Sequence, residues 1–310
     1  MTRGTGWLNR REFIKGTVAA LVLPGSLVNS ASASGDERPT ADGPVLTVAE
    51  NPDPFSATIA AINGLGGMQA FVPKGSSVLV KPNIGWDRRV DQAANTHPEV
   101  VRAVIQLCLE SGAGDILILD RTCNDARRCY VNSGMAQMVD SLDDKRVRLE
   151  HVRNNRFTTL QIPRGRLVNQ WPIYDPALET DVLINVPIAK HHSISGVTLG
   201  MKNLMGLMGG NRGSFHSGIG QKLADLTSAL TPDLNVLDAS RILVRNGPSG
   251  GRLEDVKILN KVAASTDPVA LDAYGATLFG LEPGDVSSVK AGYEMGLGEM
   301  ELARVSVSGV

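Results

Sequence analysis

The chain has 310 residues, of which 42% are hydrophobic and 20% are charged, and its formal net charge is −1. This hydrophobic content is enough for a normal globular core, and the near-neutral charge argues against a protein that binds nucleic acid or an anionic membrane surface. Three cysteines are too few for a disulfide-framework protein.

The N-terminus has the layout of a cleavable export signal. Basic residues precede an apolar stretch over residues 17–28, and a small-residue cleavage site ends at Ala33. The paired Arg10 and Arg11, followed by an apolar residue and a lysine, are typical of a bacterial twin-arginine signal. The apolar stretch is shorter than the roughly 20 residues that span a bilayer, which argues against a membrane anchor. We therefore predict a signal peptide over residues 1–33 and a periplasmic or extracellular protein that engages the twin-arginine export machinery.

Cleavage after Ala33 leaves a mature chain with 27 Lys and Arg against 31 Asp and Glu, a net charge of −4. Residues 34–44 are rich in Ser, Asp, Pro and Gly, and we predict that they form a disordered linker. Residues 45–310 contain no stretch long and apolar enough to span a membrane, and we predict that they form a single α/β domain.

Short runs rich in Val, Ile and Leu alternate with segments of helical spacing, which is typical of βαβ units. This pattern predicts a mostly parallel sheet with helices on both faces. The predicted strands are residues 78–81, 115–119, 147–152, 182–186, 234–237 and 257–264. The predicted helices are residues 98–111, with Thr96 as a possible N-cap, 221–230, and 268–278, with Asp267 as N-cap.

Polar residues directly follow five of the predicted strands. Since the carboxyl ends of parallel strands open on one edge of a sheet, we expect a shared ligand crevice there. A single polar residue after a strand is weak evidence for a ligand site, because loops are generally polar. Five such residues together favour the crevice. The residues expected at this edge are Lys81, Asn83, Asp120, Lys190, His191, His192, Asp238 and Asp267.

The densest group of candidate site residues lies between residues 181 and 216, where a predicted strand leads into a loop rich in Gly and Met. The glycines would let backbone amides approach a ligand, as in phosphate-binding loops. The alternative is a flexible loop packed through its methionines, whose histidines form hydrogen bonds with neighbouring residues and bind no ligand. We interpret the group as a cationic pocket for a carboxylate or phosphate ester. Lys190, Lys202, Asn203, Gly209 and Gly210 are then its anion contacts.

Two adjacent histidines, His191 and His192, are candidates for a proton carrier or a metal ligand. Because neighbouring side chains on an extended chain point in opposite directions, we expect only one of them to face the pocket. His97 begins a predicted helix and is a candidate either for the pocket or for a helix cap. Asp272 lies one turn into the last predicted helix and is a candidate catalytic carboxylate.

Cys123 and Cys129 are separated by five residues, too many for the usual Cys-x-x-Cys zinc or redox pair. Three interpretations remain: a disulfide, a metal or iron-sulfur site completed by histidines such as His191, and two unlinked thiols. An oxidising compartment favours the disulfide. Cys108 lies on the apolar face of a predicted helix, and we expect its side chain to be buried and to pack in the core.

Several motifs, taken in their order along the chain, resemble those of the family known as domain of unknown function 362. The resemblance covers residues 75–290 and implies an α/β fold. Some members carry an appended ferredoxin-like iron-sulfur module, which implies a loose link to redox biochemistry. This chain has no Cys-x-x-Cys-x-x-Cys run, so the resemblance does not extend to that module. The motifs that carry it are Lys81-Pro82-Asn83, Thr96-His97-Pro98, Lys190-His191-His192, Met201-Lys202-Asn203-Leu204 and Asp267 to Asp272.

These features together predict a protein that binds a small anionic molecule. The leading hypothesis is a metal- or iron-sulfur-assisted redox or group-modifying enzyme. The alternative is a non-catalytic binding or accessory protein for a small acid, a metal or a redox complex.

Overall fold

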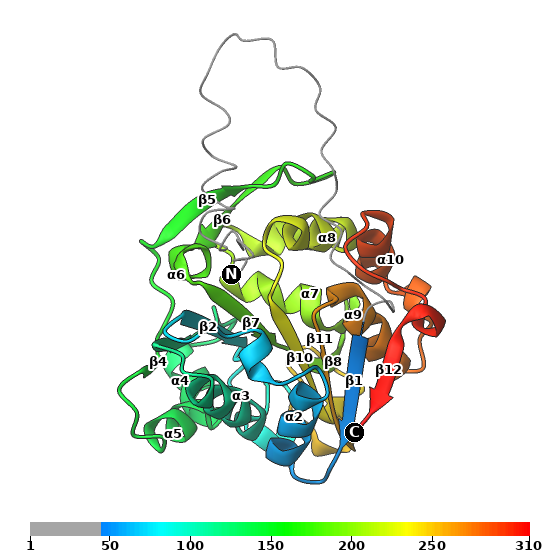
Figure 1. Ribbon diagram of the computed structural model, residues 1–310. Coiled ribbons are helices and arrows are strands. Elements are labelled where there is room, and N and C mark those ends of the chain that lie inside the picture. Colours follow the sequence, from blue (N-terminus) through cyan, green and yellow to red (C-terminus); the bar gives the residue numbers. More distant parts are fainter. Residues whose placement is uncertain (1–44) are drawn as a thin grey trace, which may run out of the picture.

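The computed structural model describes residues 45–310, and the predicted signal peptide and linker lie outside this range (Figure 1). The described chain is built around a mixed, mostly parallel sheet with the strand order β12-β1-β11-β10-β7-β2-β3-β4, to which β8 and β9 are added through β10. A separate antiparallel hairpin is formed by β5 and β6. The predicted α/β fold is therefore confirmed.

The strands of the main sheet are β1 (Val45–Glu50), β2 (Ser77–Pro82), β3 (Asp115–Ile118), β4 (Val147–Leu149), β7 (Val182–Val186), β8 (Ile188–His192), β9 (Gly196–Thr198), β10 (Leu234–Leu243), β11 (Val256–Ser265) and β12 (Ser306–Gly309). The hairpin consists of β5 (Phe157–Gln161) and β6 (Gln170–Tyr174). The helices are α2 (Pro54–Asn63), α3 (Pro98–Glu110), α4 (Ala126–Asn132), α5 (Met135–Asp140), α6 (Asp175–Glu179), α7 (Gly200–Asn203), α8 (Ile219–Ala229), α9 (Pro268–Thr277) and α10 (Ser287–Glu294).

Helices cover both faces of the sheet, with α2 to α5 on one face and α7 to α10 on the other (Figure 1). The alternation of side chains along β2 shows how each face is buried. Val78 and Val80 belong to the core beneath α2 and α3, whereas Leu79 belongs to the core beneath α8 and α9. A strand buried on both faces reads as an uninterrupted apolar run, which is why the central strands were recognisable in the sequence.

Two of the predicted helices begin with proline after a side-chain cap. Asp267 accepts hydrogen bonds from the amides of Val269 and Ala270, as predicted for an N-cap. For α3 the cap is His97 and not Thr96, because the Nδ1 atom of His97 accepts the Glu99 amide. Thr96 instead donates its hydroxyl to the carbonyl of Val186 and so connects this turn to β7.

The direction of one strand and the extent of another differ from the prediction. β11 runs antiparallel to β10, so its carboxyl end at Ser265 lies beside Asn235, near the start of β10. The apolar run that was expected to form one strand up to Lys190 is divided into β7 and β8, with Pro187 between them. Proline has no amide hydrogen for a sheet ladder, and the chain changes its pairing there.

β10 also continues past Asp238, which therefore lies inside a strand and not at its end. The Asp238 carboxylate is fully buried and forms an ion pair with Arg241 at 2.6 Å. It also accepts hydrogen bonds from the His97 amide and the Ser240 hydroxyl. This carboxylate thus connects the start of α3 to the middle of the sheet.

Replacing Asp238 with Asn should strongly destabilise the fold, because Arg241 would lose its buried counter-charge. Breaking a buried ion pair in this way costs about 3–5 kcal/mol, whereas an exposed pair contributes about 0–1 kcal/mol. The half-exposed pair of Glu99 and Arg102 has the same sequence spacing, so Glu99→Gln is a matched control. Free energies of unfolding measured in urea would contradict this account if Asp238→Asn cost no more than Glu99→Gln.

Candidate functional site

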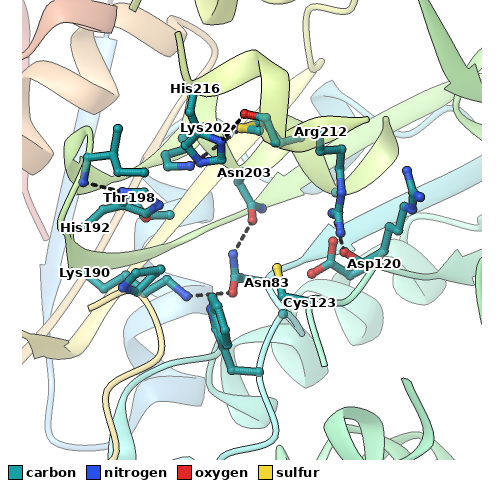
Figure 2. A pocket seen from close by; sticks show the side chains of 18 of the residues that line it. Asn83, Asp120, Cys123, Lys190, His192, Thr198, Lys202, Asn203, Arg212 and His216 are labelled. Atoms are coloured by element: carbon teal, nitrogen blue, oxygen red, sulfur yellow. Dashed lines mark hydrogen bonds between the residues drawn. The ribbon is translucent and has the colours of Figure 1, made fainter. Parts of the chain in front are cut away.

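A pocket of about 530 Å³ opens at the carboxyl ends of the parallel strands β2, β3 and β8 (Figure 2). Strand ends, the loop after β3 and the Gly-rich loop after α7 all contribute side chains to it. The lining residues include Lys81, Asn83, Trp86, Asp120, Arg121, Cys123, Lys190, His192, Thr198, Lys202, Asn203, Met205, Gly206, Gly210, Asn211, Arg212 and His216. The structure therefore brings nine of the sequence-predicted residues into one site: Lys81, Asn83, Asp120, Cys123, Lys190, His192, Lys202, Asn203 and Gly210.

A chain of side-chain amide hydrogen bonds forms the floor of the site. The Lys190 Nζ atom donates to Asn83 Oδ1 at 3.0 Å, and the Asn83 amide donates to Asn203 Oδ1 at 3.0 Å (Figure 2). The Asn203 amide donates to Asn185 Oδ1 at 2.9 Å, and the Asn185 amide donates to Asn235 Oδ1 at 2.9 Å. Every bond in the chain is donated in the same direction, away from Lys190.

Lys81 sets the orientation of this chain. Its Nζ atom donates to Asn203 Oδ1 at 2.9 Å, and because lysine has no acceptor, Asn203 must present its oxygen to the lysine and its nitrogen to Asn185. The same Nζ atom donates to the Pro82 carbonyl at 2.7 Å and forms an ion pair with Asp120 at 2.9 Å. Burial lowers the pKa of Lys81, but the Asp120 carboxylate opposes this effect and favours the ammonium form.

Lys190 is as buried as Lys81 but has no carboxylate partner. Its Nζ atom donates to Asn83 Oδ1 and to the Ala94 carbonyl, and no ion pair involves it in the described part of the chain. Burial is the main cause that lowers the pKa of Lys190 to about 7, and repulsion from Lys202 adds to the shift. At neutral pH a large fraction of this amine is therefore uncharged.

Lys202 extends into the pocket from α7 without an oxygen partner. Within residues 45–310 its ammonium contacts only the sulfur of Met205, at 3.6 Å. Burial is the main cause that lowers the pKa of Lys202 to about 8, and repulsion from Arg212 contributes to this shift. Lys202 is therefore a cation of the site that lacks an oxygen acceptor among the described residues. An anion in the pocket would accept its hydrogen bonds and would relieve the repulsion from Arg212.

His192 faces the pocket as a neutral imidazole of defined tautomer. Its Nδ1 atom accepts hydrogen bonds from the amides of Ile194 and Ser195, so its proton is assigned to Nε2. Burial lowers the pKa of His192 to about 3, and the charge of Lys202 adds to the shift. The ring stacks on His216 with 5.7 Å between the ring centroids. The site therefore contains a neutral N–H donor beside two lysines.

Besides Asp272 and Cys129, five predicted residues are not part of the pocket. His191 points the other way along β8, and its Nδ1 atom accepts the Gly247 amide. The remaining four also lie outside the pocket lining: His97, Gly209, Asp238 and Asp267. The expectation that Asp267 shares this edge of the sheet is wrong, because β11 runs antiparallel and carries Asp267 to the opposite edge.

Asp272, a candidate catalytic carboxylate, supports the site from behind. It is buried and accepts hydrogen bonds from the amides of Gly200 and Met201, at 2.6 and 3.0 Å, where α7 begins. Burial raises the pKa of Asp272 to about 7, and these two amide bonds oppose the shift. Its contacts thus hold the start of the helix that carries Lys202 and Asn203.

The favoured disulfide between Cys123 and Cys129 is absent from the structure, where both thiols are free. Cys123 lines the pocket, whereas Cys129 lies on the inner face of α4 within the hydrophobic core. Burial raises the pKa of Cys129 to about 11. Cys108 is buried in the same core, as predicted.

The described residues 45–310 do not form a metal or iron-sulfur site. Over residues 45–310 no three His, Cys, Asp or Glu side chains are grouped so as to hold a metal ion. His191, proposed as a ligand with Cys123 and Cys129, does not line the pocket. An iron-sulfur cluster is usually held by four cysteine thiolates, more than this chain contains.

Sequence analysis missed two arginines that line the pocket. Arg121 donates to the carbonyl of Met208, and Arg212 donates to the carbonyls of Arg121 and Thr122. The two arginines thereby connect the loop after β3 to the Gly-rich loop. Arg121 directly follows Asp120 at a predicted strand end, and this position was a usable signal. Arg212 carried no signal of its own, because its position over the pocket depends on the folding of the Gly-rich loop.

Comparisons with known proteins define the family. Residues 78–277 match the family model described as domain of unknown function (DUF362). The chain is also 32% identical over 241 residues to a protein from Synechocystis sp. that is named as thylakoid-associated, covering 75% of this chain and 72% of that protein. The chain therefore belongs to the DUF362 family, as its motifs predicted.

Two solved structures are similar at lower levels. The lactate racemase apoprotein from Thermoanaerobacterium thermosaccharolyticum aligns with a TM-score of 0.49 and 10% identity, over 75% of this chain and 56% of that one. A protein from Thermotoga maritima aligns with a TM-score of 0.39 and 12% identity, over 79% of this chain and 60% of that one. The chain thus spans less than two thirds of either protein.

Replacing Gly206 with Ala should disrupt the buried ion pair between Lys81 and Asp120 in the pocket. A Cβ atom at this position would lie 1.8 Å from Asp120 Oδ1 and 2.6 Å from Lys81 Nζ, so the buried ion pair would have to move. Overpacking alone typically costs about 1–3 kcal/mol. Gly284→Ala is the control, because a Cβ atom there meets nothing within 4 Å. Equal melting temperatures for the two variants would show that Gly206 does not need to be glycine.

Proposed function

We propose that this protein is an enzyme that binds a small organic anion, such as a polycarboxylate or a phosphate ester, in the pocket. The observation that carries the proposal is the imbalance of charge. Lys81, Arg121, Lys190, Lys202 and Arg212 line the pocket together with a single carboxylate, Asp120. Because Asp120 is already paired with Lys81, the other basic groups have no carboxylate of their own in the lining.

Lys202 supplies the principal contact for the anion. It has no oxygen partner in the described chain, and its charge is opposed by burial and by Arg212. The buried hydroxyl of Thr198 also lines the pocket without a hydrogen-bond partner among the described residues. A bound oxyanion would satisfy both groups, since it accepts hydrogen bonds and carries the missing negative charge.

Catalysis, in addition to binding, is supported by the protonation states around the site. Lys190 has a pKa of about 7, and His192 is a neutral donor through Nε2. A group that titrates near neutral pH can exchange a proton with a ligand at little cost, which is the property required of a general acid or base.

A non-catalytic accessory protein is the second candidate. The observation that favours it is the name of the Synechocystis relative, which describes association with a thylakoid. Within residues 45–310 no helix is long and apolar enough to cross a membrane. A binding protein would hold the anion unchanged, so turnover of the bound molecule separates the two candidates.

Inorganic phosphate or citrate should raise the melting temperature of the native protein in a saturable way, because a ligand of the folded state stabilises it by mass action. Lys202→Met should remove most of this shift while leaving the unliganded melting temperature equal or higher. Lys145 is exposed and distant in sequence from the pocket residues, so Lys145→Met is a matched control. Above pH 8 the affinity for citrate should fall by up to about tenfold per pH unit as Lys202 loses its proton. An unchanged anion response in Lys202→Met would refute the proposal.

We also propose that the protein is exported by the twin-arginine route, on the basis of Arg10 and Arg11. Replacing both with Lys should leave the unprocessed precursor in the cytoplasm, because the machinery recognises the arginine pair. Cell fractionation with an antibody against the mature chain measures this. Normal export of the double variant, lost only when the general secretory route is blocked, would refute it.

A further inference from the structure

Lys81 and Lys190 are two buried lysines in one pocket whose hydrogen bonds differ in number and kind. Lys81 Nζ has three acceptors, which match the three N–H bonds of an ammonium group, and one of them is the Asp120 carboxylate. Lys190 Nζ has two acceptors in the described chain, Asn83 Oδ1 and the Ala94 carbonyl, and neither is charged. Two acceptors match the two N–H bonds of a neutral amine and leave its lone pair unused.

From this geometry we propose that Lys190 is a nucleophilic amine that forms an imine with a small oxo acid, a carbonyl compound that also carries a carboxylate or phosphate. The inference rests on the proposed function, because the anionic group of the oxo acid would bind to Lys202. It goes further by naming the functional group that reacts and the atom that attacks.

The surroundings of Lys190 fit this chemistry. Its side chain is 1% exposed but lines the pocket, and its Nζ atom extends toward Asn83 at the centre of the site (Figure 2). Burial and the positive charge of Lys202 both disfavour the ammonium form and lower the pKa of Lys190. Desolvation and a neighbouring cation are the two usual means by which proteins prepare a lysine for attack on a carbonyl.

The reaction balances without an oxidant or reductant. The Nζ lone pair forms a bond to the carbonyl carbon, and the carbonyl π electrons move to oxygen, which takes up a proton. The amine then releases a proton to give a neutral carbinolamine. The hydroxyl of the carbinolamine takes up a second proton and leaves as water while the nitrogen lone pair forms the C=N bond, and the resulting iminium loses its last N–H proton, so that amine and carbonyl yield imine and water. Lys202 has three N–H bonds, so its ammonium can bind the anionic group and also donate a proton to the departing oxygen, whereas neutral His192 can donate only a hydrogen bond to that oxygen through Nε2–H.

Reductive trapping tests the proposal directly. The full-length protein is incubated with pyruvate and cyanoborohydride near pH 7, and its peptides are then mapped by mass spectrometry. Lys190 should carry one reduced pyruvate, whereas Lys81 should remain unmodified as an internal control. Lactate, which has the carboxylate but no carbonyl, should give no adduct and should slow the reaction with pyruvate. Labelling confined to exposed lysines such as Lys257 would overturn the proposal.

A second measurement separates this proposal from the proposed function and does not depend on a variant that folds. Acetaldehyde carries a carbonyl but no charge, so its reductive attachment reports the amine alone. The rate at Lys190 should reach half of its maximum near pH 7, whereas exposed lysines should do so roughly three pH units higher. If Lys190 follows the exposed lysines, the nucleophile is refuted even when phosphate binds. If Lys190 reacts with acetaldehyde but phosphate and pyruvate do not bind, only the anion site is refuted.

Discussion

A one-way chain of hydrogen bonds through four asparagines is the interaction on which the site depends. It runs from Lys190 through Asn83, Asn203 and Asn185 to Asn235, and it joins the ends of β2, β7 and β10 to α7. A side-chain amide offers an oxygen on one side and a nitrogen on the other, so reversing one member would place a donor against a donor on one side of it and an acceptor against an acceptor on the other. The series of hydrogen bonds can keep a single direction because Lys190 donates to its first amide, Asn83, and Lys81 donates to its second amide, Asn203.

This arrangement explains how one pocket can hold two buried lysines in different states. Lys81 is neutralised by Asp120, and the pair is enclosed by Gly206, where even a methyl group has no space. Lys190 donates only to neutral oxygens, and the more distant charge of Asp120 opposes its desolvation only in part, so its pKa is lowered to about 7. Lys81 therefore has a structural role, whereas Lys190 is the lysine that we propose for chemistry. Asp272 contributes indirectly, since it secures the start of the helix that presents Asn203.

The sequence predicted the main features of the fold because each central strand is a short apolar run followed by a polar residue at its carboxyl end. It could not predict the direction of β11, since an apolar run is the same in either orientation, and Asp267 was misplaced for that reason. The residues expected at the pocket do line it where they follow a parallel strand within two positions, as for Asn83 and Asp120. It failed for Arg212, whose position depends on a loop without a regular period.

The protonation of the two lysines is the central claim, and it is directly observable. A neutron crystal structure of the deuterium-exchanged protein, at about one pH unit above the pKa of about 7, would show the hydrogen positions on both Nζ atoms. The account predicts two deuterium atoms on Lys190, directed at Asn83 and Ala94, and three on Lys81. Three deuterium atoms on Lys190 under these conditions would contradict it, because the amine would then have no lone pair with which to react.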